Sequence, residues 1–276
     1  MCFIPYPIIL AISFLCRMKL LLCINRFRDF KTLFEGIAAH GGQLHSPMPD
    51  PASSHFIFSL NYLQHEIDIC ETGFGLFQTA FKVTKAISQK KYHLALKASF
   101  CNAYKAELNI GDIVNVIKDK PGDIGIPDLT LNLTPSERDL NSQYNLTPTL
   151  SKGEGGTAFA DLYDLGLLNS EDFPHFKGAF INMNNSYMNV LMPFRKVVSV
   201  TVNQYANVNT YEAKREKYKA DIETGDGLGF VYPCMYDRQP FYQLNAVERN
   251  LATGESDFDK AREKLNETLL DILQKL

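Results

Sequence analysis

The sequence predicts a single α/β domain with a mixed, twisted central β-sheet and helices on both of its faces. Short apolar runs at residues 20–24 and 67–70 are each followed by a stretch with helical spacing of apolar residues, at 30–39 and 76–88. No linker rich in proline, serine or glycine divides the 276 residues, which favours one domain over two smaller ones. Apolar residues make up 45% of the chain, so there is enough material for one sizeable core.

Charge and cysteine usage narrow the class of protein. The 28 Lys and Arg residues are balanced by 31 Asp and Glu residues without a basic block, which argues against a protein that tracks the phosphates of a nucleic acid. The six cysteines form no CxxC pair, and the six histidines form no HxxxH or HExxH pattern. We therefore expect free, buried thiols in the reducing cytoplasm, no metal, no cofactor and no nucleic-acid partner.

The first 17 residues are strongly apolar but lack a positively charged start and a small-x-small cleavage site. The run is also shorter than the roughly 20 residues that a membrane-spanning helix needs, so no membrane association is expected. We interpret residues 1–17 as a mis-assigned start or an N-terminal extension, with an export or anchoring segment as the alternative. The domain proper is then expected over residues 18–276, from Met18, whose MKLLLCIN run is typical of a first strand.

The remaining elements follow the same patterns along the chain. Further strands are expected at residues 56–60, 94–96, 113–116, 196–203 and 241–247, and further helices at 211–218, 228–235 and 257–276. In the helix at 30–39 we expect Leu33, Ile37 and Ala38 to point inward. Ser256 and Asp259 resemble a capping box at the start of the last helix.

Three loops are candidates for a site or a lid. Open α/β sheets bind ligands beyond the carboxyl ends of their strands, so residues 25–29 are a candidate wall. Residues 72–75 contain a lone GxG, which either allows a tight turn or binds phosphate, and packing is the simpler explanation. Residues 119–156 are rich in turn formers and predict a long surface excursion, typical of a lid or an oligomer contact.

The central stretch of the chain is residues 93–118. An apolar run at 94–96 is followed by small and compact residues from Ala98 to Ala103 and then by an Ile- and Val-rich run at 113–116. The pattern predicts a strand, a small-residue turn that could present backbone N–H groups to a ligand, and a second strand.

This central stretch resembles the centre of the nucleoside phosphorylase and nucleosidase superfamily, where an apolar strand is followed by Ala-Gly-x-Ala-Gly and, later, by Leu-Gly-[Asp/Glu]-Val-Val. Four further stretches occur in the same order as in that family: ETGFG at 71–75, FADLYDLGL at 159–167, IETGDGLGF at 222–230 and PFYQLNAV at 240–247. Futalosine hydrolase is the subgroup that the chain resembles most, and methylthioadenosine/S-adenosylhomocysteine nucleosidase is more distant. The resemblance spans about residues 18–276 and implies a divergent member with the nucleosidase-like α/β fold.

The resemblance implies a cytoplasmic hydrolase that releases the nucleobase from a 5′-modified purine nucleoside in menaquinone biosynthesis, with a homo-oligomer left open. Cleavage of an N-ribosidic bond develops oxocarbenium character on the sugar and negative charge on the departing base. Such an enzyme needs an acid for the base nitrogen, a carboxylate that orients water and a group that holds the ribose hydroxyls.

The matching positions imply Asp29, Asp226 and Arg249 as the catalytic set. Asp29 stands where the family has a water-activating Glu, and Asp226 stands where it has a ribose-binding Glu, so each carboxylate is one methylene shorter. Arg249 stands where the proton donor or its Asn equivalent is expected, and a guanidinium cannot act as a general acid near neutral pH. The implied substrate-binding residues are Phe100, Asn102, Tyr205 and Gly225.

The glycine turn of the family has become Ala98-Ser-Phe-Cys-Asn-Ala-Tyr104, which puts side chains at Ser99 and Asn102 where the backbone should approach a ligand. These departures leave three hypotheses open: a hydrolase with an impaired site, a non-catalytic nucleoside-binding paralogue, and a phosphorylase-like transferase. In the last of these, Arg26, Arg28 and Arg249 would form a pocket for phosphate.

Overall fold

The computed structural model describes residues 17–45, 56–123, 169–174, 176–183, 188–191 and 193–276. The expectations for residues 1–16, for most of the stretch at 119–156 and for the motif at 159–167 lie outside these residues. The strands of the sheet are β1 (Lys19–Ile24), β2 (Gln43–Leu44), β3 (Ile57–Tyr62), β4 (His65–Glu71), β5 (Leu94–Ala103), β6 (Ile113–Pro121), β7 (Phe180–Ile181), β8 (Arg195–Thr201), β9 (Ile222–Thr224) and β10 (Phe241–Asn250). The helical elements are η1 (Phe27–Phe30), α1 (Lys31–Ala39), α2 (Leu76–Gln89), α4 (Met188–Leu191), α5 (Tyr211–Tyr218), α6 (Gly227–Tyr236) and α7 (Phe258–Lys275).

The predicted mixed α/β sheet is confirmed, and part of it closes on itself. The strand order is β10-β6-β8-β9-β5-β1-β4-β3-β2, with both parallel and antiparallel neighbours. Because β10 pairs with β5 as well as with β6, the strands β5, β10, β6, β8 and β9 form a closed ring. All five strands contribute to one cluster of buried apolar side chains, which includes Ala103, Val114, Val197, Ile222 and Val247. The ring therefore has a packed interior.

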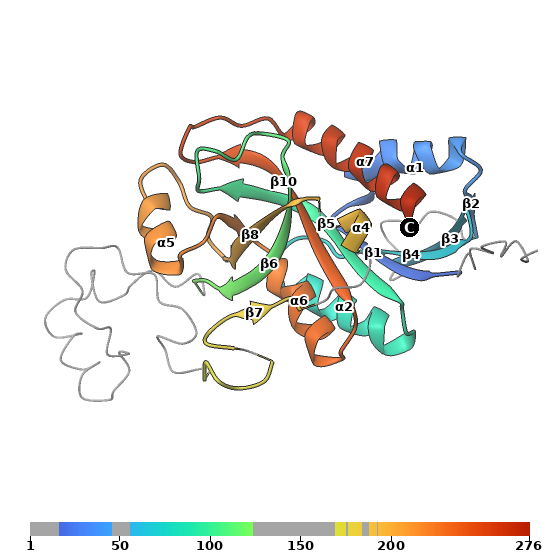
Figure 1. Cartoon of the computed structure of the whole chain (residues 1–276), viewed down its shortest axis with the longest axis horizontal. Helices are drawn as coiled ribbons and strands as arrows, with labels where there is room; N and C mark the ends of the chain where they lie inside the picture. Colours follow the sequence, from blue (N-terminus) through green and yellow to red (C-terminus); the bar gives the residue numbers. More distant parts are fainter. Residues whose placement is uncertain (1–16, 46–55, 124–168, 175, 184–187, 192) are drawn as a thin grey trace, which may run out of the picture.

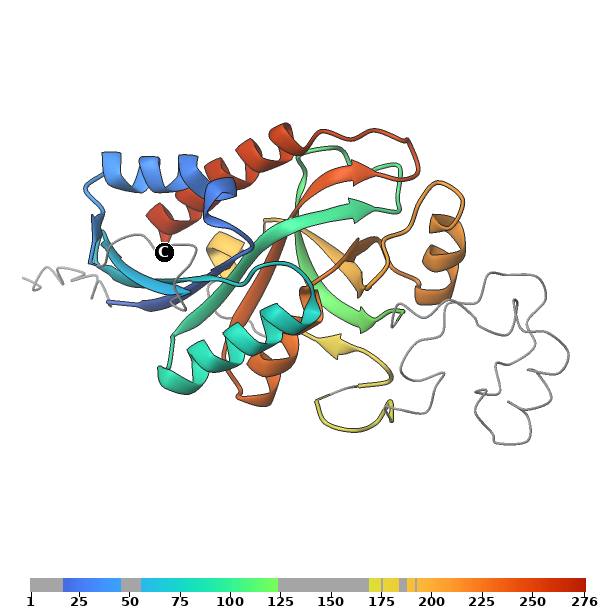
Figure 2. The ribbon, with the colours of Figure 1, turned by 180° about the vertical axis from the view of Figure 1, so that it is seen from behind.

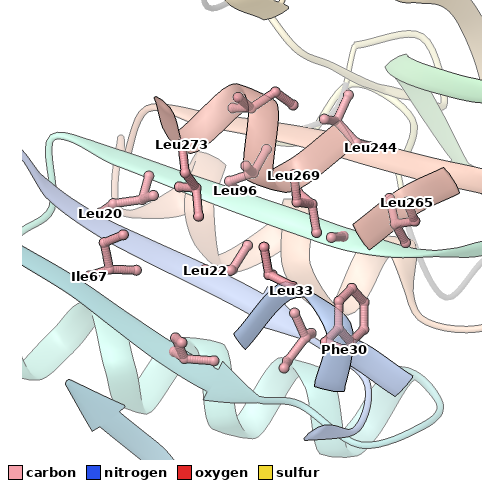
Figure 3. Close-up of a cluster of buried hydrophobic side chains, with 14 of the residues drawn as sticks. Leu20, Leu22, Phe30, Leu33, Ile67, Leu96, Leu244, Leu265, Leu269 and Leu273 are labelled. Atoms are coloured by element: carbon pink, nitrogen blue, oxygen red, sulfur yellow. The ribbon is translucent and has the colours of Figure 1, made fainter. Parts of the chain in front are cut away.

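Helices cover both faces of the sheet, as the sequence predicts: α1 and α7 lie on one face, and α2 and α6 lie on the other (Figures 1 and 2). The apolar stripe of α7 includes Ala261, Leu265, Leu269 and Ile272, whose spacing of three or four residues turns them all toward the sheet. Figure 3 shows the leucines of α7 meeting those of β1 and β5 together with Phe30. Burial of this stripe fixes α7 on the sheet.

The main correction concerns the central stretch. The small residues from Ala98 to Ala103 form no turn, because they belong to one continuous strand, β5. Strand β5 pairs with β1, β10 and β9, so its backbone groups are satisfied by neighbours along both edges. Pairing on both edges outweighs the local preference of serine and asparagine for turns, and the chain turns only at residues 104–112.

Two smaller expectations were wrong. The side chain that caps α7 is Asp257, which accepts a hydrogen bond from the Lys260 backbone N–H at 2.9 Å, whereas the Ser256 hydroxyl donates to the Glu248 carbonyl at 3.3 Å. Ser256 therefore ties the start of α7 to β10. Ala38 is exposed on α1, since Leu33 and Ile37 alone make the buried stripe of that helix.

The cysteines of the described ranges, Cys23, Cys70, Cys101 and Cys234, are free and buried, as the sequence predicts. Burial raises the pKa of the Cys23, Cys101 and Cys234 thiols, so these groups are held as unreactive thiols. Across the residues that the structure describes, no helix combines the length and the apolar character that crossing a bilayer requires.

Candidate active site

A cavity of about 550 Å³ lies where the segments that follow β1, β4, β8 and β9 meet side chains of β5, β10 and α7. This volume falls in the range of small-molecule sites. Three carboxyl side chains from distant parts of the sequence line it: Asp29, Asp226 and Glu248. The cavity is therefore acidic, and its acidic groups are held on three different elements.

Asp226 sits at the first position before α6 and is only 4% exposed. Its two carboxylate oxygens accept hydrogen bonds from Lys97 Nζ at 2.8 Å and from Asn25 Nδ2 at 2.6 Å. Lys97 is buried in β5 and also donates to the Ser99 hydroxyl, which in turn donates to Asn245 Oδ1. This chain of contacts fixes the carboxylate at the wall of the cavity, and each oxygen keeps a lone pair for a further donor.

Asp29 lies in η1, directly after β1, and is 5% exposed. The Arg26 Nε donates to Asp29 Oδ2 at 3.0 Å, and the Arg26 guanidinium lies over the Phe74 ring, 4.5 Å from its centroid. The backbone carbonyl of Asp29 accepts from Asn266 Nδ2 at 3.0 Å, so α7 also holds this segment. Asp29 is thus positioned through both its side chain and its backbone.

Glu248 is the carboxyl group of the cavity that sequence reasoning missed. The pairing of β10 with β5 shifts register between Val247 and Arg249, so Glu248 is the extra residue of a β-bulge. The bulge aims the half-buried Glu248 side chain into the cavity. Burial raises the pKa of the Glu248 carboxyl, and the negative charge of Asp29 acts in the same direction, while Arg249 opposes them.

The same bulge places Arg249 outside the cavity, where its side chain is exposed. The prediction that Arg249 lies in the site is therefore wrong. The inserted residue changes the faces of the strand on which the side chains of Glu248 and Arg249 lie. No sequence signal other than the adjacency of two charged residues at the end of a strand marked this bulge.

Asn102 also lies away from the cavity. Its Nδ2 donates to Glu223 Oε1 at 2.9 Å, and both residues are buried. The Glu223 carboxylate further accepts from the Tyr104 hydroxyl at 2.7 Å and from the Ala206 backbone N–H at 3.0 Å. Asn102 therefore supports the loop that carries Tyr205 rather than meeting a ligand. The Ser99 side chain likewise faces Lys97 and Asn245, so neither side chain intrudes where the sequence suggested an obstruction.

The other expected binding residues, Phe100, Tyr205 and Gly225, do line the cavity. The Phe100 ring packs on Phe258 with 4.7 Å between ring centroids, which makes one wall apolar. A Cβ at Gly225 would lie 2.6 Å from the Tyr205 hydroxyl oxygen, so glycine is the residue that lets the tyrosine lie close to the strand end. Aromatic walls of this kind suit a planar ring.

The three arginines of the phosphorylase hypothesis do not converge. Only Arg26 lines the cavity, and it is paired with Asp29. Arg28 Nε lies 3.7 Å from Asp29 Oδ1, but the Arg28 side chain is 72% exposed and does not line the cavity, and Arg249 is exposed outside the cavity. The described residues therefore offer no cluster of guanidinium groups for a phosphate at this site.

Comparison of the sequence with protein-family models and with curated proteins gives no match. Solved structures do match the fold. A futalosine hydrolase mutant of Helicobacter pylori aligns with a TM-score of 0.62 at 14% identity, over 94% of this chain and 100% of that one. A mutant Helicobacter pylori nucleosidase with 5′-methylthioadenosine in its active site gives 0.63 at 13% identity, over 95% and 100% of the two chains.

The Campylobacter jejuni 5′-methylthioadenosine/S-adenosyl homocysteine nucleosidase gives a TM-score of 0.59 at 16% identity, covering 94% of this chain and 100% of that chain. All three alignments span nearly the whole of both chains, at identities that establish shape but not activity. The protein therefore has the fold of the futalosine hydrolases and of these nucleosidases.

Proposed function

We propose that this protein hydrolyses the N-ribosidic bond of a purine nucleoside and that its substrate is a 5′-modified nucleoside of the futalosine type, in menaquinone biosynthesis in the cytoplasm. The observation that carries the proposal is the convergence of Asp29, Asp226 and Glu248 on one cavity of suitable size. The proposal is also supported by the fold, which is shared with a futalosine hydrolase and with a nucleosidase that holds 5′-methylthioadenosine in its active site.

In this proposal Asp29 orients and deprotonates the attacking water. It lies in the cavity, and its ion pair with Arg26 fixes the position of the carboxylate. Asp226 accepts hydrogen bonds from the ribose hydroxyls through the lone pairs that Lys97 and Asn25 leave free. Phe100 and Phe258 form the apolar wall on which the sugar or the base packs.

One observation favours a second candidate, a non-catalytic nucleoside-binding protein. The buried Lys97 ammonium lies 2.8 Å from Asp226 and partly neutralises the carboxylate that would stabilise a cationic sugar. A site with that charge distribution can bind ribose hydroxyls without accelerating cleavage. Base release separates the two candidates directly.

The test is a release assay with the full chain. Purified protein is incubated separately with futalosine and with 5′-methylthioadenosine, and free base is quantified by chromatography. The proposed hydrolase releases base from at least one of them, and Asp29→Asn lowers the rate by about a hundredfold or more, because a water-activating carboxylate is lost. Binding of both nucleosides without base release would instead assign the protein to the non-catalytic class.

We also propose that the protein forms a homo-oligomer. The packed pair of helices α2 and α6 carries exposed aromatic side chains, among them Phe77 at 83%, Phe81 at 65% and Tyr236 at 61%. A cluster of exposed apolar side chains marks an interaction site, and a second copy offers a matching one. Light scattering of Phe77→Glu/Phe81→Glu against the wild type tests this, and a monomeric wild type would contradict it.

A further inference from the structure

The backbone of Glu248 is held in place at the cavity by several hydrogen bonds. Its backbone carbonyl accepts hydrogen bonds from the Asp257 backbone N–H at 3.0 Å and from the Ser256 hydroxyl at 3.3 Å. The carbonyl of its neighbour Val247 accepts from the Gly111 N–H at 2.9 Å. The bulge is therefore hydrogen-bonded both to the turn that precedes β6 and to the start of α7. These contacts fix the backbone from which the Glu248 side chain extends into the cavity.

The surroundings of Glu248 suit a carboxyl that can carry a proton. Phe100 and Phe258 line the same cavity and give this region an apolar lining, while Asp29 lines it as a second acid. Burial and the Asp29 charge both raise the pKa of Glu248, and the neighbouring Arg249 lowers it. Asp29, by contrast, is paired with Arg26, so the two carboxyls have different partners. Two acids held in unequal environments are the arrangement that separates a general acid from a general base.

We propose that Glu248 is the general acid that protonates the departing nucleobase, in the place that the alignment of motifs gave to Arg249. This assignment rests on the proposed hydrolase function and adds to it a residue that acts on the leaving group. The evidence for the assignment is the bulge that directs Glu248 into the cavity, the apolar lining of the cavity, and Asp29 as a second carboxylate that can activate the water.

Hydrolysis of the C1′–N bond requires only Glu248, Asp29 and one water molecule. The C1′–N bond breaks with its electron pair going to the base, and the Glu248 carboxyl gives its proton to a ring nitrogen of that base. Water forms the new C1′–O bond while Asp29 accepts a proton from the water. The products are the free sugar and the neutral base, and exchange with solvent returns a proton to Glu248 and removes one from Asp29.

The experiment compares leaving groups. A nucleoside methylated at N7 carries a positive base, which departs as a neutral molecule without receiving a proton. We therefore measure hydrolysis of futalosine and N7-methylfutalosine, and of 5′-methylthioadenosine and its N7-methyl derivative, by wild type, Glu248→Gln, Glu248→Asp and the control Glu255→Gln. Glu255 is an exposed glutamate in the loop before α7, so its variant controls for the loss of one negative charge near the site.

Glu248→Gln is expected to slow hydrolysis of futalosine or 5′-methylthioadenosine by about a hundredfold to ten-thousandfold, the usual contribution of a general acid. The same variant should change hydrolysis of the 7-methyl nucleosides by less than about tenfold, Glu248→Asp should recover part of the loss, and Glu255→Gln should match the wild type. Equal losses on both kinds of nucleoside would show a structural role and overturn the assignment, as would no loss on either.

Failure of the hydrolase function can be distinguished from failure of the role of Glu248. Wild-type protein that hydrolyses none of these nucleosides would overturn the proposed function and the role of Glu248 with it. Wild-type hydrolysis that Glu248→Gln leaves intact would overturn the role of Glu248 alone.

Discussion

At the scale of single residues, the site depends on charges that are buried together. Lys97 is 1% exposed and Asp226 is 4% exposed, and their charged atoms lie 2.8 Å apart. Each charge is tolerated in the core only because the other is present, and each has one further hydrogen bond, from Asn25 to Asp226 and from Lys97 to Ser99. The pair therefore contributes more to the position of the Asp226 carboxylate than to the net stability of the protein.

Lys97→Met should lower the free energy of unfolding by about 3–5 kcal/mol, because it leaves the Asp226 charge buried without its cation. Combining it with Asp226→Asn should recover a large part of that loss, since no charge then remains unpaired. Urea denaturation of the two single variants and the double variant measures this coupling. As a control, Lys264→Met breaks the exposed pair with Glu267 and should leave the free energy of unfolding nearly unchanged. Additive losses at Lys97 and Asp226 would contradict the buried pair.

A second buried acid makes stability depend on pH. Burial raises the pKa of Asp119 to about 7, and Asp226 adds to this effect, although Thr201 hydrogen bonds and Lys97 oppose it. A carboxyl whose pKa is higher in the folded state binds its proton more tightly there, so its contribution to stability falls as pH rises from its unfolded pKa of about 4 to its folded pKa.

Asp119→Asn removes this titration. The stability of the wild type relative to Asp119→Asn should therefore fall between about pH 4 and pH 7 and level off above that range. Thermal or urea unfolding of both proteins across this range gives the difference. A difference that grows with pH would reverse the sign and contradict a raised pKa.

At the scale of elements, α7 connects the core to the site. Asn266 Oδ1 accepts from the Leu33 backbone N–H at 2.9 Å, and its Nδ2 donates to the Asp29 carbonyl at 3.0 Å. One side chain of α7 thus satisfies a free N–H in the first turn of α1 and holds the segment that carries Asp29. This contact explains why a polar residue lies within the apolar stripe of the helix.

Asn266→Ala should cost about 1–3 kcal/mol, because it leaves a buried donor and a buried acceptor unsatisfied. It should also lower kcat for base release more than it raises KM, since Asp29 would lose its fixed position while the rest of the cavity stays intact. Denaturation and steady-state kinetics on the same preparation measure both effects. As a control in the same helix, Glu267→Ala replaces the exposed neighbour of Asn266 and should leave both quantities nearly unchanged. Unchanged kinetics in Asn266→Ala would contradict the positioning role.

The sequence predicts helices and strands well where buried residues recur at a regular spacing. It fails where the conformation depends on pairing with strands that are distant in sequence. Helix α5 begins and ends at the expected residues, and β1 and α2 differ from expectation by one residue at an end. The continuity of β5 was missed because its backbone hydrogen bonds are made with β1, β9 and β10, which lie far away in sequence. The bulge at Glu248 was missed for the same reason, since it exists only relative to the register of β5.

At the scale of the whole molecule, the fold brings together residues that a motif alignment can only place in order. Asp29, Phe100, Tyr205, Gly225 and Asp226 were expected in one site and line one cavity. Their convergence follows from a sheet whose strands deliver loops from different parts of the chain to one region. The residues that the alignment misplaced, Asn102 and Arg249, both lie on strands of the closed ring, where side-chain direction depends on pairing.

The measurement that tests the central claim most directly is the fate of solvent oxygen during turnover. The protein is incubated with futalosine or 5′-methylthioadenosine in H2(18)O, with and without inorganic phosphate, and the sugar product is analysed by mass spectrometry. A hydrolase that uses Asp29 to activate water predicts free base together with a sugar that carries the heavy oxygen at C1′, at a rate independent of phosphate. A sugar 1-phosphate formed only with phosphate present, or intact nucleoside after prolonged incubation, would contradict the hydrolase.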